Sequence, residues 1–161
     1  MNIDDFIENP HPFLDGMSEL HLRILAENAT KTHFAPGEII FRQGESANRF
    51  YLIEHGEVAL QTHAAGRLTT VQTIGPGEAL GWSWLFPPHH WLCDARAQKE
   101  SWAISMDALS VYVPGLLEKS EVDTALGYEL MKRVAKTVVH RLHSTRLKFI
   151  QASISNTLPT V

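Results

Sequence analysis

The spacing of glycines between short apolar segments in residues 34–60 constrains the fold more than any other feature of this sequence. Three segments of strand length alternate there with three glycines: 39–41, 50–53 and 58–60, with Gly37, Gly44 and Gly56. Because glycine adopts positive φ without steric cost, glycines between short strands favour tight turns. The pattern predicts a mainly β fold, an antiparallel β-roll.

The rest of the chain extends this β pattern and adds helices. We predict strands at residues 31–34, 39–41, 50–55, 57–63, 67–74, 93–98 and 101–106. Ser18 is a candidate N-cap for a helix that runs to about Asn28. A short helix is expected to begin near Asp107 and to end near Pro114. Helices are therefore predicted both before and after the strands along the chain.

A set of residues in the predicted roll matches the pattern of a known family. The matching residues are Phe34, Pro36, Gly37, Ile39, Gly44, Glu45, Tyr51, Ile53, Gly56, Val58 and Leu60. On these residues the chain resembles the effector domain of the Crp/Fnr superfamily, the cyclic-nucleotide-binding domain of catabolite activator proteins and of kinase regulatory subunits. The resemblance runs over about residues 20–149. It implies a double-stranded β-helix with an N-terminal helix and a long C-terminal helix, acting as a regulatory sensor and not as an enzyme.

Residues 74–97 lie where this family has its phosphate-binding cassette. Gly81 would open a one-turn helix, and free backbone N–H groups around Trp82, Ser83 and Trp84 would hold an anion. In the family, a glutamate directly after this glycine binds the ribose, and an arginine and a serine or threonine bind the cyclic phosphate. In an ungapped alignment, Trp82 takes the place of the glutamate.

The arginine and serine positions of the family fall at Trp91 and Leu92 in this alignment. Loss of two charge-assisted contacts would weaken cyclic nucleotide binding by roughly 10² to 10⁴. The resemblance therefore implies a cyclic nucleotide bound with altered specificity, or another anionic small molecule, and it assigns no cofactor with certainty. The predicted ligand-binding residues are Gly81, Trp82, Ser83, Trp84, His90, Trp91 and Arg96.

The same aromatic residues also suit a packed core. Three tryptophans and Phe86 within ten residues often form a hydrophobic wall. In that alternative, the pocket is filled by tryptophan and the chain is a ligand-free structural dimerisation or protein-interaction module. Asp94 and Arg96, two residues apart on a strand, would then share one face and pair with each other.

A long helix is predicted over about residues 121–150, so we assign one domain to residues 1–150 and a tail to residues 151–161. One face of this helix repeats at alternating steps of four and three: Thr124, Tyr128, Met131, Ala135, Val138, Leu142, Thr145 and Phe149. This is the period of a two-helix coiled coil, and the resemblance implies a dimerisation helix. We therefore predict a homodimer, the alternative being that this face covers the roll of its own subunit.

Charge argues against direct nucleic-acid binding. The 161 residues carry a formal net charge of −4, although six basic residues cluster on the long helix: Lys132, Arg133, Lys136, Arg141, Arg146 and Lys148. Such a run is usually a solvated helix face. The family's DNA-binding helix-turn-helix follows the long helix, and residues 151–161 are too few for it, so we expect it to be missing and nucleic-acid binding to require an added domain.

Other chemistries are disfavoured. Cys93 is the only cysteine, which excludes an intrachain disulfide and a CxxC metal pair. The N-terminus lacks the pattern of a signal peptide. We therefore expect a cytoplasmic protein without membrane contact. The segment from Gly81 to Leu85 lacks the second glycine of a nucleophile elbow. His89, His90 and Cys93 lack a second ligand pair, and an H-x-H motif is absent, so we expect no metal and no catalytic residues.

Overall fold

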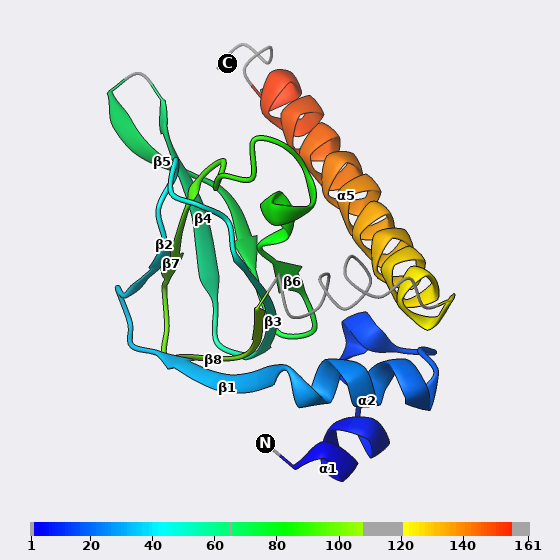
Figure 1. The fold of residues 1–161 in the computed structure, drawn as a ribbon. Helices are drawn as coiled ribbons and strands as arrows, with labels where there is room; N and C mark the ends of the chain where they lie inside the picture. The colour runs from blue at the N-terminus through cyan, green and yellow to red at the C-terminus, as the bar shows by residue number, and fades with distance from the viewer. Residues whose placement is uncertain (1, 65, 108–120, 156–161) are drawn as a thin grey trace.

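The computed structural model describes residues 2–64, 66–107 and 121–155. Its strands form a β-roll of two antiparallel four-stranded sheets. Figure 1 shows the N-terminal helices at one end of this roll and the long helix α5 (Glu121–Ser155) along its side. The predicted mainly β fold with flanking helices is therefore confirmed.

The strands pair in two sheets, and all seven predicted strands occur with ends within two residues of the expected ones. The first sheet has the order β1 (Ala29–Phe34), β8 (Ser101–Asp107), β3 (Arg49–His55) and β6 (Ala79–Leu80). The second has the order β2 (Ile39–Phe41), β7 (Asp94–Ala97), β4 (Val58–Ala64) and β5 (Arg67–Ile74). The pattern missed β6, because a strand of two residues shows no alternation.

Alternation along β3 divides the interior into two cores. Phe50 and Leu52 face a core shared with the helices, whereas Tyr51 and Ile53 face the inside of the roll. Successive side chains of a strand point to opposite faces, so this sheet is buried on both sides. The run from Phe50 to Ile53 is accordingly apolar without a break.

The N-terminal segment forms three short helices: α1 (Ile3–Glu8), the 3-10 helix η1 (Pro12–Leu14) and α2 (Glu19–Glu27). The predicted N-cap of α2 is confirmed, because Ser18 Oγ accepts a hydrogen bond from the His21 N–H at 3.3 Å. Helix α1 was not predicted, since six residues with one buried side chain, Phe6, give no usable period. The short helix predicted from Asp107 to Pro114 lies outside the described residues, apart from Asp107, which ends β8.

Helix α5 presents two different apolar faces. Leu126, Leu130 and Val134 are buried against the roll and the N-terminal helices. The face predicted to form a dimer seam is exposed at Tyr128, Met131, Ala135, Val138, Leu142, Thr145 and Phe149. The alternative in which this second face covers the roll therefore does not hold. The helix also continues five residues past the predicted end at Ile150.

Candidate functional site

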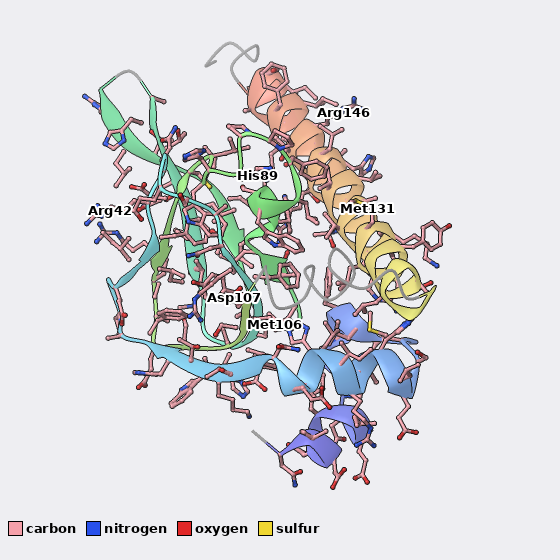
Figure 2. The ribbon with its side chains drawn as sticks, in the orientation of Figure 1. Arg42, His89, Met106, Asp107, Met131 and Arg146 are labelled. Atoms are coloured by element: carbon pink, nitrogen blue, oxygen red, sulfur yellow. The ribbon has the colours of Figure 1, made fainter. Side chains whose placement is uncertain are left out.

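The cassette begins at Gly81, whose backbone requires glycine. Its φ is +94°, and a Cβ at this position would lie 2.7 Å from the carbonyl oxygen of Arg49. A side chain would therefore collide with β3 as well as strain the backbone. The 3-10 helix η2 (Trp82–Leu85) follows directly, at the place where a one-turn helix was predicted. Figure 2 shows His89 on the loop after η2, on the side of the roll that faces α5.

Trp91 lies in the interior of the roll. Its side chain is 4% exposed and stacks on Phe41, with ring centroids 3.9 Å apart and planes 13° from parallel. Its backbone N–H donates to the Glu45 carbonyl at 2.9 Å. The position that the ungapped alignment assigned to the family's phosphate arginine is thus a core position, while the neighbouring Leu92 is 72% exposed.

The other two cassette tryptophans are partly buried and pack against different cores. Trp82 contacts the core beneath the helices, and Trp84 contacts the interior of the roll. The Trp84 carbonyl accepts a hydrogen bond from His89 Nδ1 at 2.8 Å, which ties η2 to the following loop. Ser83 is partly buried in η2 between them.

The two cations predicted from the sequence point to other partners. His90 is exposed and its Nδ1 donates to the Pro88 carbonyl at 2.6 Å. Arg96 Nη1 donates to the Gly37 carbonyl at 3.1 Å, in the turn between β1 and β2. Asp94 accepts instead from the Gln43 N–H at 2.7 Å, so the pairing of Asp94 with Arg96 that we considered is not formed between these described residues.

A different cation, Arg141 of α5, lies against the cassette. Its side chain is only 8% exposed, and its guanidinium carbon is 4.4 Å from the ring centroid of Trp82. Nη2 donates to the Ala79 carbonyl at 2.5 Å and lies 3.7 Å from Glu78 Oε1. Such a contact joins a cation to the face of an indole and is stronger when water is excluded.

The buried guanidinium is incompletely satisfied. Within the described part of the chain, Arg141 Nε and Nη1 are buried and have no hydrogen-bond acceptor. Burial lowers the pKa of Arg141 to about 10, against opposing effects of Glu78 and Cys93, so the side chain is still charged at neutral pH. Buried charged donors without acceptors are rare in proteins, and each calls for a reason such as a bound water or ion.

The sequence interpretation missed this residue, because Arg141 was counted with the solvated basic residues of the helix. A signal was present, however. Leu126, Leu130, Val134 and Arg141 are separated by steps of four, four and seven, which places them on one helix face. An arginine that continues a buried apolar stripe is therefore a candidate for a buried, functional side chain.

Helix α5 also packs directly on η2. Leu130 and Val134 of α5, together with Trp84 and Leu85 of η2, line a gap of only about 10 Å³. A gap of this size is at the lower limit for one water molecule. The cassette helix and the long helix are therefore in close apolar contact, and a shift of one must change the packing of the other.

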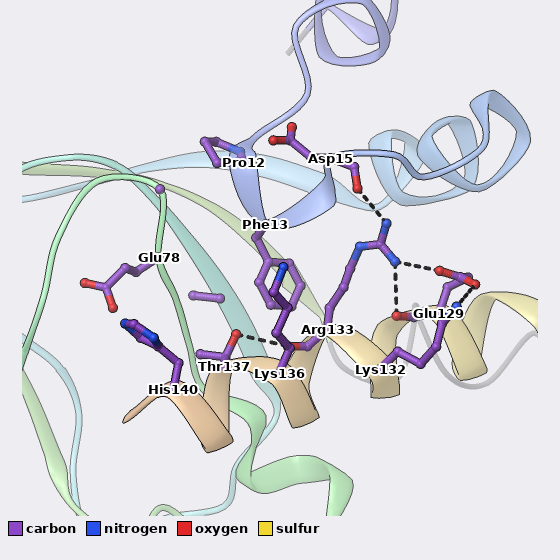
Figure 3. Close-up of a pocket in the computed structure, with 12 residues that line it drawn as sticks. Pro12, Phe13, Asp15, Glu78, Glu129, Lys132, Arg133, Lys136, Thr137 and His140 are labelled. Carbon is purple, nitrogen blue, oxygen red and sulfur yellow. Dashed lines mark hydrogen bonds and ion pairs between the residues drawn. The ribbon is translucent and has the colours of Figure 1, made fainter. Parts of the chain in front are cut away.

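A larger groove of about 690 Å³ lies beside this contact, between η1, the turn before β6, and α5 (Figure 3). Two of its basic side chains, Lys132 and Arg133, are paired within the chain. Arg133 donates to Glu129 Oε2 at 2.6 Å and to the Asp15 carbonyl at 2.8 Å, and Lys132 pairs with the same Glu129. These hydrogen bonds from Lys132 and Arg133 lower the pKa of Glu129.

The described residues lack the features of a metal site and of a membrane-spanning helix. Residues 2–64, 66–107 and 121–155 contain no group of three or more His, Cys, Asp or Glu side chains placed to hold a metal ion. Over the same residues, no helix combines the length and the apolar character needed to cross a membrane.

The β-roll with its cassette loop is the architecture of a cyclic nucleotide-binding domain, and the family is shown by sequence. A family model for the cyclic nucleotide-binding domain matches residues 31–112, more than half of the chain. The chain belongs to the cyclic nucleotide-binding domain family. No curated protein sequence matches it.

Solved structures with the same fold come from several organisms. A candidate cyclic nucleotide-binding protein from Geobacter metallireducens is 26% identical, with a TM-score of 0.74 over 89% of this chain and 99% of that one. A cyclic nucleotide-binding domain from Methylobacillus flagellatus has a TM-score of 0.77 at 14% identity, over 98% and 88%. The regulatory subunit of a cAMP-independent protein kinase A from Trypanosoma cruzi, bound to guanosine, has a TM-score of 0.59 at 23% identity, over 84% of this chain and 50% of that one.

Proposed function

We propose that this chain is a non-catalytic regulatory domain that binds a small ligand at its cassette and transmits binding through α5. The observation that supports this most directly is the buried contact between Arg141 of α5 and Trp82 of the cassette. A ligand at this junction would contact both elements. It would bias the position of α5 only if its affinity differs between two positions of that helix.

The ligand we favour is nucleotide-like but not cyclic AMP bound in the usual way. Trp82 takes the place of the family's ribose glutamate, and Trp91 is committed to the core. A kinase regulatory subunit with a similar fold has been described as independent of cAMP and bound to guanosine. That protein supports the idea that this fold accepts nucleotide-related ligands other than cyclic nucleotides.

We also propose that two copies associate through the exposed seam of α5. The seam side chains are exposed along the whole described repeat from Tyr128 to Phe149, and their spacing is that of a two-helix coiled coil. Large apolar side chains exposed in a continuous stripe typically mark an interface. A second copy provides the matching stripe.

Calorimetric titration with cyclic AMP, cyclic GMP and guanosine, each up to about 1 mM, tests the sensing role. We expect at least one to bind, and the Trp82→Ala variant to lose that binding. Trp102→Ala is the control, because Trp102 lies on β8, outside the cassette segment, where it is exposed and its ring contacts that of His33. Binding that survives in Trp82→Ala would contradict the proposed location of the site.

The second candidate is a ligand-free interaction module. It is favoured by the close packing of α5 on η2, which needs no ligand to hold the helix in place. In that case, none of the three compounds would bind, and replacement of Trp82 would change only the stability of the fold.

A further inference from the structure

Arg141 differs from every other described arginine of this chain in being both buried and short of hydrogen-bond acceptors. It has five N–H donors, of which Nε holds one and Nη1 holds two. These two atoms have no acceptor within the described residues, and the side chain is 8% exposed. An anion from outside the chain would supply the acceptors that these donors lack.

The surroundings of the guanidinium place it at the cassette. Its carbon lies over the Trp82 ring at 4.4 Å, and Nη2 is held by the Ala79 carbonyl at 2.5 Å. On the far side of the cassette sequence, Cys93 is close enough for its thiol and the guanidinium to influence each other's pKa. The cation therefore lies against residues 79–82 of the cassette.

The nearest acidic group among the described residues, Glu78, does not complete the site. Glu78 Oε1 is 3.7 Å from Nη2, which is beyond hydrogen-bond distance, and its side chain is 40% exposed to solvent. An exposed carboxylate at this distance interacts weakly because water screens it. A ligand anion would therefore not have to displace a strong internal ion pair.

We propose that the ligand of this domain carries a phosphate group and that Arg141 of α5 binds it. This inference rests on the proposed sensing function and names the chemical class of its ligand. Guanidinium groups match the charge and geometry of phosphate better than any other side chain. The family's phosphate arginine belongs to the cassette, whereas here the charge is supplied by the helix that transmits the signal.

This arrangement links binding to movement. A phosphate bound at Arg141 contacts α5 directly, and α5 is packed on η2 with a gap of only about 10 Å³. Adding a bulky anion at this junction changes the spacing of the two helices. Ligand binding and helix position are then coupled through one side chain.

The test compares nucleotides with their nucleosides in matched variants. Calorimetry is run with 5′-AMP, 5′-GMP, cyclic AMP, cyclic GMP, adenosine, guanosine and inorganic phosphate, on the wild type, Arg141→Met and Arg146→Met. Arg146 is the control because it lies on the same helix, has the same charge and is exposed; Figure 2 shows it near the far end of α5.

We expect the wild type to bind at least one nucleotide roughly 10- to 100-fold more tightly than its nucleoside, as one charge-assisted contact provides. Arg141→Met should abolish that ratio, and Arg146→Met should keep it. Equal binding of nucleotide and nucleoside by the wild type would overturn this inference while leaving the sensing function in place. A ratio that survives in Arg141→Met would also overturn it, and silence with every compound would overturn both proposals.

A second measurement does not depend on calorimetry. Burial and Asp94 raise the pKa of the Cys93 thiol, and Arg141 lowers it. Phosphate bound at Arg141 should cancel the lowering of the Cys93 pKa by Arg141, and should therefore slow the alkylation of Cys93 by iodoacetamide. The site of alkylation is unambiguous because the chain has one cysteine. The slowing should occur in the wild type and be absent in Arg141→Met. Unchanged alkylation in the wild type at a saturating nucleotide would contradict the proposal.

Discussion

Trp91 shows how the environment of a single residue decides its role. The ungapped alignment places it where the family has a phosphate-binding arginine, yet its indole is stacked on Phe41 inside the roll. Substitution by arginine would bury a charge next to an aromatic ring, with no acceptor supplied by the fold. Restoring the family's cassette residues at this position would therefore be expected to unfold the roll and not to create a cyclic nucleotide site.

Trp91→Ala should lower the free energy of unfolding by about 3–5 kcal/mol, because it removes a large buried ring and leaves a cavity. The neighbouring Leu92, which is exposed, provides the matched control, and Leu92→Ala should change stability by less than about 0.5 kcal/mol. Urea denaturation followed by circular dichroism measures both. Similar losses in the two variants would mean that Trp91 is not a core residue.

His11 ties the N-terminal segment to the roll in its neutral form. Its Nε2–H donates to the Ile53 carbonyl at 2.9 Å, and Nδ1 accepts from the Phe13 N–H at 3.2 Å. Burial lowers the pKa of this histidine, against smaller opposite effects of the Ile53 carbonyl, Glu54 and Asp15. Protonation of Nδ1 would remove an acceptor that the backbone of η1 uses.

Stability should therefore depend on pH through His11. Because its pKa in the folded state is below 6.5, its contribution is complete above about pH 6.5 and is lost as the pH falls from there towards the folded-state pKa. His11→Gln, which keeps an amide donor, removes this titration. Urea denaturation at about pH 7.5 and about pH 5.5 should show a larger loss in the wild type than in His11→Gln. Parallel losses in the two proteins would disprove the assignment.

At the scale of one element, α5 combines two functions on two faces. The buried stripe of Leu126, Leu130 and Val134 attaches the helix to the roll, and Arg141 continues it to the cassette. The exposed stripe is displaced by about 100° around the helix, which is less than a third of a turn. Mutations on the two faces should therefore have separable effects.

Val138→Asp should dissociate the proposed dimer without unfolding the protein, because Val138 is exposed within one copy. Leu130→Ala should instead lower the stability of the fold by about 2–5 kcal/mol. His143→Asp adds the same charge at an exposed position outside the seam and should leave the mass unchanged. Sedimentation equilibrium gives the mass of each variant. A monomeric wild type, or a dimeric Val138→Asp, would contradict a dimer through this seam.

At the scale of the whole molecule, ligand, roll and second copy would all act on one helix. The cassette contacts the middle of α5 through Trp82, Trp84 and Leu85, while the seam lies on its outer side. In Figure 1, α5 extends along the side of the roll with no other described element beyond it. A change at the cassette that shifts α5 would therefore also change the proposed contact between two copies.

If two copies associate, association stabilises the folded state by mass action. The melting temperature of the wild type should rise with protein concentration, and that of Val138→Asp should not. Differential scanning calorimetry over about a hundredfold range of concentration measures this. A melting temperature that is independent of concentration in both proteins would mean that folding and association are not linked.

Much of the fold could be predicted because its signals are local. Gly37, Gly44 and Gly56 mark turns by a property of their own backbone, and Ser18 caps a helix through an atom three residues away. Alternation in β3 and the four-three spacing in α5 likewise follow from the geometry of a single element. The placement of Ala79, Leu80 and residues 3–8 was missed because elements so short provide no period.

The sequence by itself determined where strands, turns and helices lie, since these depend on residues a few positions apart. Only the tertiary structure decided that Trp91 packs inside the roll and that Arg141, rather than His90 or Arg96, lies over Trp82. Arg141 and Ala79 are 62 positions apart, so no local period brings them together. Their contact arises because the apolar stripe of α5 is buried against the roll, and burying that stripe fixes where the arginine that continues it must lie.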